Sequence, residues 1–140
     1  MWPYTSEELD ALTGPRGELE VRTVAMPADT NPAGEIFGGW IMALMDTAGM
    51  IAAARMAQGR VVTVAVTDMA FIHPVRVGDV VCCYADFVRL GTSSATFHIE
   101  VWALRAGSGS RVKVTDAEFK FVALDANRKP RAFVPEAAVA

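Results

Sequence analysis

Residues 36–57, IFGGWIMALMDTAGMIAAARMA, form an apolar run in which Asp46, Thr47 and Arg55 are the only polar side chains. Nearly every residue of the run is apolar or a good helix former, so the pattern predicts one long helix. A helix that is apolar on every side has no face suited to water and must be covered all round. Any fold for this chain therefore has to wrap other structure around one central helix.

A membrane span is the alternative for this run, because about 20 apolar residues suffice to cross a bilayer. Asp46 lies at its centre, where a carboxylate costs about 2.5 to 3.5 kcal/mol on insertion scales. Basic residues do not flank the run closely, as they would at a membrane surface. We therefore favour the buried helix of a globular domain.

The hydrophobic period changes after the helix. Four runs rich in β-branched and aromatic residues follow, separated by HPVRVG, GT and AGSGS, and they occupy residues 60–72, 79–90, 93–105 and 111–124. Their alternation predicts successive antiparallel strands, with a further strand expected at 18–26 before the helix. Strands of about 12 residues exceed the usual five or six, and long strands curve with the twist of the sheet. The predicted fold class is α+β, a curved antiparallel sheet wrapped around a long central helix.

One face of the predicted sheet carries polar residues. In 93–105 the side chains of His98, Glu100 and Trp102 alternate with apolar neighbours. We expect this face to meet solvent or a partner, with His98 exposed and Trp102 belonging to a partner surface.

Composition limits the organisation and the partners. A chain of 140 residues with 52% hydrophobic composition fits one domain, which we expect at 18–136, with an N-terminal arm at 1–17 and a tail at 137–140. A net charge of −3 argues against a general nucleic-acid binder. The N-terminus lacks a basic start followed by an apolar core, so no secretory signal is expected and the cytoplasm is the predicted location.

The carboxylate inside the helix needs an explanation. On a helix, Asp46 shares a face with apolar neighbours such as Met42 and Met50. It must then be hydrogen-bonded, protonated or open to a water-filled pocket. Alternatively, the helix breaks near Met45 and Asp46 caps a second segment.

Two glycines stand near the helix start. Without side chains, Gly38 and Gly39 allow another group to approach the backbone, and the first N–H groups of a helix can hold an oxyanion. Alternatively, the two glycines serve only to let the helix start pack tightly against its neighbours.

Several motifs together resemble a known family. Asn31, Gly34, IFGGW, Asp46 and GRVVTVAVTDMAFIHPVRVGDVVCCY are similar to the hotdog-fold acyl-CoA thioesterases of the YciA type, relatives of the cytosolic long-chain acyl-CoA hydrolases. The resemblance runs from about Glu20 to about Glu136 and includes GTSS and VTDAEFKFVALD. It implies a hotdog fold, two protomers that join their sheets edge to edge, and further assembly into tetramers or hexamers. The active site would lie between protomers.

The resemblance implies a reaction and its residues. Acyl-CoA and water would give a fatty acid and CoA. Asp46 matches the family's helix carboxylate and would act as general base or nucleophile, while Asn31 matches its loop asparagine and would orient the water or the carbonyl. The N–H of Gly39, with Gly38 as second candidate, would stabilise the oxyanion.

The CoA moiety needs an anionic contact and a channel. Arg89, Ser93 and Ser94 are the predicted phosphate and ribose contacts, with Arg60 and Arg76 as weaker candidates. Pantetheine would run along residues 71–74, where Phe71, His73 and Pro74 would form the wall, rather than His73 acting as a general base. No metal or separate cofactor is expected, because CoA is part of the substrate. Methionines of the helix and Phe71 would line an adaptable acyl tunnel.

Two other functions use the same features. A dehydratase of hotdog fold also acts on acyl thioesters, but it pairs an acid with a histidine, and no histidine lies near Asp46 in the sequence. An acyl-CoA sensor would bind the ligand without turnover, which would leave the carboxylate in the helix without a purpose.

Overall fold

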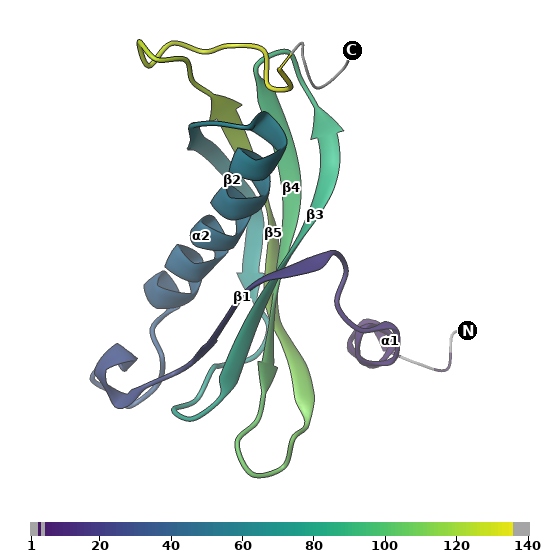
Figure 1. Cartoon of the computed structure of the whole chain (residues 1–140). Coiled ribbons are helices and arrows are strands. Elements are labelled where there is room, and N and C mark those ends of the chain that lie inside the picture. Colours follow the sequence, from purple (N-terminus) through teal and green to yellow (C-terminus); the bar gives the residue numbers. More distant parts are fainter. Residues whose placement is uncertain (1–2, 4, 136–140) are drawn as a thin grey trace.

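In the computed structural model, which describes residue 3 and residues 5–135, a long helix lies across a curved antiparallel sheet (Figure 1). The strands are β1 (Glu18–Val24), β2 (Val61–Phe71), β3 (Val80–Leu90), β4 (Ser94–Leu104) and β5 (Arg111–Ala123). They form a five-stranded sheet in the order β1-β3-β4-β5-β2, so β1 and β2 are its edges. The helices are α1 (Ser6–Thr13), the 3-10 turn η1 (Pro27–Asp29) and α2 (Gly38–Ala57). All predicted strands are present, and the predicted tail at 137–140 lies outside the described residues.

The core lies between α2 and the inner face of the sheet. The helix buries mainly small residues there, and these are Ile41, Met45, Ala48, Gly49, Ala52, Ala53 and Ala57. The sheet contributes large side chains such as Phe121, which has no exposed surface. A Cβ added to Gly49 would lie 2.6 Å from the Phe121 ring, so glycine is what lets the helix lie this close to β5.

The central helix differs from the sequence prediction in two respects. It begins at Gly38 rather than Ile36 and runs without a break, so the alternative in which Asp46 caps a second segment is wrong. One of its faces is open in a single chain, since Asp46 is exposed and Met42 and Met50 are each 42% exposed. The prediction of a helix buried all round is therefore wrong for a single chain, because one sheet covers only one side of it. Among the described residues, no helix is both long and apolar enough to cross a membrane.

The part of the outer face around Glu100 and Trp102 is covered, contrary to the sequence prediction. The chain before β1 folds back so that α1 contacts β5 on the side opposite α2 (Figure 1). The N–H of Arg16 donates to the Glu100 carboxylate at 3.2 Å. Trp102 is 1% exposed, Glu100 is 5% exposed and His98 is largely buried, so these residues form no open surface. α1 and the segment that follows it thus pack against the sheet.

A charged network lies beneath this arm. His98 Nε2 and the Trp102 indole N–H both donate to Glu100, at 2.8 and 2.9 Å. Burial acts to raise the pKa of Glu100, but these hydrogen bonds, the Arg16 N–H and the nearby Lys113 ammonium outweigh it and lower the pKa to about 2. Glu100 is therefore a buried anion whose partners are supplied by the fold.

Candidate active site

A cavity of about 390 Å³ opens where α2 begins. It lies between the loop before the helix and the segment that follows β2, and its lining residues are Asn31, Glu35, Ile36, Phe37, Gly38, Ile41, Phe71, Ile72, His73, Pro74 and Val75. Five residues predicted for the site are among them: Asn31, Gly38, Phe71, His73 and Pro74. Residues more than 30 positions apart in sequence are thus brought together by the fold.

The loop that carries Asn31 is braced by its own hydrogen bonds. The Asn31 side-chain oxygen accepts the N–H groups of Ala33 and Glu35 at 2.9 and 3.1 Å. The Asn31 backbone N–H donates to the Glu35 carbonyl at 2.7 Å. The amide oxygen is therefore engaged within the loop, and the chemistry left to this side chain is donation from its NH₂ group.

The N-terminus of α2 borders the cavity. Phe37 precedes the helix and provides no side-chain cap, and within the described residues no acceptor faces the N–H groups of Gly38 and Gly39. A Cβ at Gly38 would lie 3.3 Å from the Phe71 ring, so packing against β2 is one reason for glycine there. Gly39 is exposed. This helix end offers N–H donors and the positive end of the helix dipole.

His73 forms part of the cavity wall. Its Nδ1–H donates to the Lys113 carbonyl at 2.9 Å, which fixes the ring against the start of β5. This position agrees with the predicted wall role.

Asp46 is held by a residue that the sequence analysis did not single out. The Thr63 hydroxyl, on β2, donates to Asp46 Oδ1 at 2.5 Å. Thr63 alternates with the exposed Val62 and Val64, so it points toward the helix side of an edge strand. The available signal was a hydroxyl between valines in the first half of the strand, VVTVAV.

Asp46 does not line the cavity of its own chain. Gly39 and Asp46 share a helix face but are seven residues apart, which is about 10 Å along the axis. The predicted catalytic residues are therefore separated within one chain, since Asn31 lines the cavity and Asp46 lies away from it, beside Thr63. A single chain does not enclose a site around Asp46.

The predicted phosphate contacts lie at the other end of the sheet. Ser94 pairs with Val122 of β5, whereas His73 of the cavity wall contacts Lys113 of the same strand. Lys113 and Val122 are nine residues apart, which is about 30 Å along β5. Ser93 and Ser94 belong to the connection between β3 and β4 and the start of β4. The Arg89 guanidinium is exposed and lies 3.7 Å from Glu118. The structure of one chain therefore does not bring Arg89, Ser93 and Ser94 to the cavity.

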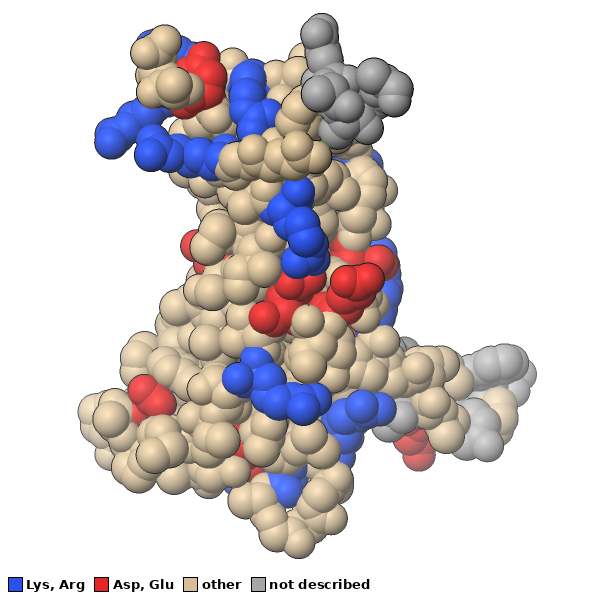
Figure 2. All heavy atoms as spheres, in the orientation of Figure 1, with Lys and Arg blue, Asp and Glu red and all other residues tan. Residues whose placement is uncertain are grey.

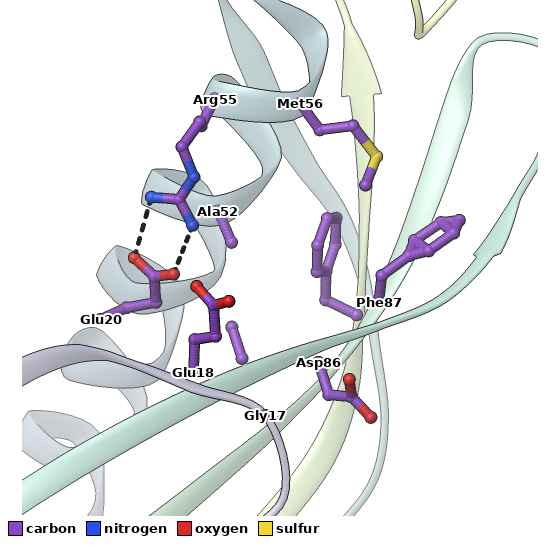
Figure 3. A pocket seen from close by; sticks show the side chains of 10 residues that line it. Gly17, Glu18, Glu20, Ala52, Arg55, Met56, Asp86 and Phe87 are labelled. Carbon is purple, nitrogen blue, oxygen red and sulfur yellow. Dashed lines mark hydrogen bonds and ion pairs between the residues drawn. The ribbon is translucent and has the colours of Figure 1, made fainter.

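A second cavity, of about 440 Å³, lies beside β1 (Figure 3). It is bordered by the acidic residues Glu18, Glu20 and Asp86, and Arg55 of α2 reaches across to Glu20 with contacts of 2.5 and 3.2 Å. None of the predicted site residues lines it.

One side-chain group has the composition of a metal site. Among the residues that the structure describes, His98, Glu100 and Asp116 offer ligand atoms within 4.8 Å of one another. The Lys113 ammonium lies 2.6 Å from Asp116 and 3.8 Å from Glu100. A cation of the chain thus already balances these carboxylates, and the group does not fit a further metal ion.

Solved structures share this architecture. A hexameric broad specificity acyl-coenzyme A thioesterase superimposes with a TM-score of 0.84 at 50% identity, covering 90% of this chain and 87% of that one. A hexameric hotdog fold thioesterase of Campylobacter jejuni gives a TM-score of 0.82 at 40% identity, covering 88% of this chain and 94% of that one. Together with the helix and sheet described above, these matches confirm the predicted hotdog fold and define the class of the protein as a hotdog-fold thioesterase.

Sequence comparison narrows the class. The model of the thioesterase superfamily matches residues 33–109. The acyl-CoA thioester hydrolase YciA of Escherichia coli K12 is 55% identical over 125 residues, which are 87% of this chain and 95% of the relative. The chain belongs to the thioesterase superfamily and, within it, to the acyl-CoA thioester hydrolases of the YciA type. The resemblance found in the sequence is confirmed, and the protein is an enzyme of the thioester hydrolase class.

Proposed function

We propose that this protein hydrolyses acyl-CoA to a free fatty acid and CoA at a site shared by two protomers. The observation that carries the proposal is the Asp46 carboxylate, which is held by Thr63 on the open face of α2 in a chain 55% identical to a named acyl-CoA thioester hydrolase. A carboxylate presented in this way is suited to activating water or attacking a carbonyl.

The partner protomer would join at the β2 edge. Val62, Val64 and Val66 on this edge are 43%, 52% and 40% exposed, and β2 contacts α2, the helix that carries the exposed Met42 and Met50. An apolar edge strand beside an apolar helix face is a surface that a second copy would cover. A two-fold axis makes such strands antiparallel, so the Phe71 end of one β2 meets the Val61 end of the other. This brings the Asn31 cavity of one protomer toward Asp46 of its partner.

The assembly is proposed to go further than a dimer. The solved relatives described above are hexameric thioesterases. We therefore propose a hexamer built from three such dimers.

The reaction is proposed to begin with water. Thr63 donates to one oxygen of Asp46, so the other oxygen is available to take a proton from water as the water oxygen attacks the thioester carbonyl carbon. The N–H of Gly39, assisted by Gly38, stabilises the charge on the carbonyl oxygen. The C–S bond then breaks, and the CoA sulfur leaves with the proton that Asp46 had taken. Attack by Asp46 itself, through an anhydride that water then hydrolyses, is the alternative route.

Asn31 and the cavity wall would position the substrate. Because its oxygen is engaged in the loop, Asn31 would donate from its NH₂ group to the carbonyl or the water. Pantetheine would pass Phe71, His73 and Pro74. CoA enters as part of the substrate, and no separate cofactor takes part in the proposed reaction. The cytoplasm is the proposed location.

The decisive experiment compares wild-type protein with Asp46→Asn in an assay for free thiol on a panel of acyl-CoAs from short to long. We expect kcat to fall by roughly 100-fold or more, since a catalytic base or nucleophile is lost, while the oligomer stays intact. Asp86→Asn is the matched control, because it removes the same charge from β3, three strands away from β2 in the sheet. Near-normal turnover of folded Asp46→Asn would contradict the proposal. Tight acyl-CoA binding without thiol release by the wild type would favour a sensor instead.

A further inference from the structure

A buried ion pair lies at the end of the sheet where α2 begins. In Figure 1 the β2–β3 and β4–β5 connections both lie at this end, the lower one in that view. Asp79 ends the first connection and has a side chain that is 2% exposed, and the side chain of Arg105, which follows β4, is 12% exposed. The Arg105 guanidinium donates to Asp79 Oδ2 at 2.6 Å. Figure 2 shows surface Lys and Arg side chains together at the opposite end, around the loop that follows β5, so this pair is a separate, internal contact.

The Asp79 carboxylate also closes the turn that precedes β3. Its Oδ2 accepts the N–H of Arg76 at 2.9 Å, and the Asp79 N–H donates to the Arg76 carbonyl at 3.0 Å. Its Oδ1 accepts the N–H of Ala106 at 3.4 Å. Buried hydrogen bonds of this kind are rigid, because the loss of one partner leaves a polar group unsatisfied. One side chain therefore fixes the turn at 76–79 and joins it to the end of β4.

This turn holds both ends of the loop that carries Asn31. At the first end, the N–H of Ala25 donates to the Asp79 carbonyl at 3.0 Å. At the second end, the N–H of Ile36 donates to the Val75 carbonyl at 3.3 Å, two residues before α2 begins. Ala25 and Val75 have no exposed surface, so both contacts belong to the core. A loop held at its two ends by one turn keeps Asn31 in a fixed place relative to the start of α2.

The other wall of the cavity is held by different contacts. The N–H groups of Ile72 and His73 donate to the Val114 carbonyl of β5 at 2.8 and 3.4 Å. This wall therefore depends on β5, whereas the loop with Asn31 depends on the turn at Asp79. A change in the ion pair should move the loop and leave the wall in place.

We propose that Asp79, together with Arg105, is a positioning residue for Asn31 in the reaction, an inference that rests on the proposed thioesterase function. Asn31 would donate to the carbonyl or the water, so its distance from the reacting atoms affects the rate. Asp79 acts through the loop and does not touch the substrate. Arg105 is required because a buried carboxylate keeps its place only with a cation and hydrogen-bond donors beside it.

The test measures kcat and KM for an acyl-CoA in Asp79→Asn and Arg105→Gln. We expect kcat to fall by roughly 10-fold in each, because a small displacement of a positioned group is costly. KM should change by less than about 2-fold, since the wall at 71–74 is held by β5. Arg105→Lys keeps the cation and should retain most of the rate. Glu100→Gln is the control, because it neutralises a carboxylate of similar burial on β4 and should leave kcat unchanged.

A double variant separates positioning from stability. Asn31→Ala removes the side chain that the loop presents, so Asp79→Asn should then cause no further fall in kcat. An ion pair that served only the stability of the fold would lower the melting temperature and leave kcat of the folded protein unchanged. Non-additive kcat values therefore identify Asp79 as acting through Asn31.

Two results would overturn the inference. One is a kcat within about 2-fold of wild type in folded Asp79→Asn or, if that variant does not fold, in Arg105→Gln. The other is a fall in kcat by the same factor with and without the Asn31 side chain.

Hydrogen exchange tests the ion pair without any assay of turnover. If the wild type releases no thiol from any acyl-CoA, the proposed function fails, and this measurement then decides the role of Asp79. The N–H groups of Asn31 and Ile36 should exchange at least about 10-fold faster in Asp79→Asn, with those of β4 unchanged, because the loop has lost its anchor. Equal exchange in the two proteins would reject the role of Asp79.

Discussion

The two edges of the sheet are built in opposite ways. The β1 edge is short and charged, with Glu18, Glu20 and Arg22 along it and the Arg55–Glu20 ion pair beside it (Figure 3). The β2 edge is longer and presents Val62 and Val64 to the outside. Charges on an edge strand oppose pairing with another chain, whereas an apolar edge invites it. This difference supports the proposal that a second copy covers the β2 edge, whereas charges protect the β1 edge as a surface.

A charge on the β2 edge should have the largest effect. Val64→Lys would place an ammonium group in the proposed protomer contact, so we expect dissociation of the oligomer and a loss of turnover of roughly 100-fold or more, because the site needs both protomers. Light scattering and thiol release measure the two effects. Val24→Lys makes the same change at a 45% exposed valine of the β1 edge and should alter neither. Equal effects of the two variants would remove the distinction between the edges.

The next effect concerns the hydrogen bond on the inner side of the β2 edge. Thr63→Val removes the donor to Asp46 and keeps the shape of the side chain. We expect kcat to fall by about 10-fold with little change in KM, since a hydrogen bond to a charged group is worth about 1.5 to 3 kcal/mol. Thr67→Val, four residues along β2, is the control. Unchanged kcat in an oligomeric Thr63→Val protein would show that the bond does not position the carboxylate.

The central strand β4 provides a reference far from both edges. The pKa of Glu100 is about 2 in the folded protein, below the ordinary value of 4.5. As the pH falls, the Glu100 carboxylate is therefore protonated in the unfolded chain before it is protonated in the folded protein. The free energy of unfolding should therefore decline from about pH 4.5 toward pH 2. Denaturant unfolding at several pH values should show a shallower decline in Glu100→Gln. An identical pH profile for both proteins would contradict this assignment.

The smallest effect is expected at the β1 edge. Arg55→Ala removes the ion pair with Glu20, in which the arginine side chain is 59% exposed and the glutamate side chain 6% exposed. Solvent screens the arginine, but the carboxylate is left without its cation, so we expect a loss of about 1 to 2 kcal/mol in unfolding free energy and no change in turnover. Thermal unfolding and the thiol assay measure these. A loss of activity as large as that of Thr63→Val would place the second cavity in the function.

Local pattern was sufficient to predict much of the fold. The alternation in 93–105 and 111–124 predicted strands whose ends lie within one or two residues of those of β4 and β5. The apolar run 36–57 predicted α2, which begins two residues later, at Gly38. Asp46 was noticed as the carboxylate within the apolar run, and the family resemblance added Asn31 and predicted a catalytic role for both. These features depend on side-chain period and on short motifs, which are properties of neighbouring residues.

The rest depended on contacts between distant segments. Trp102 looked exposed because its strand neighbours are polar, yet it is 1% exposed, and the Arg111 guanidinium of β5 lies over its ring, 5.5 Å from the ring centre. Asp46 looked buried because its helix neighbours are apolar, yet one sheet leaves its face open. Periodicity records which residues share a face but not what covers that face.

The sequence by itself determined the order and length of the elements, the glycines at the start of α2 and the carboxylate within it. Only the tertiary structure decided that Thr63 holds Asp46, that Asn31 meets His73 around a cavity, and that the two edges of the sheet differ. The physical reason is that secondary structure follows from interactions over a few residues, whereas burial and hydrogen bonding of a side chain depend on which remote segment packs against it.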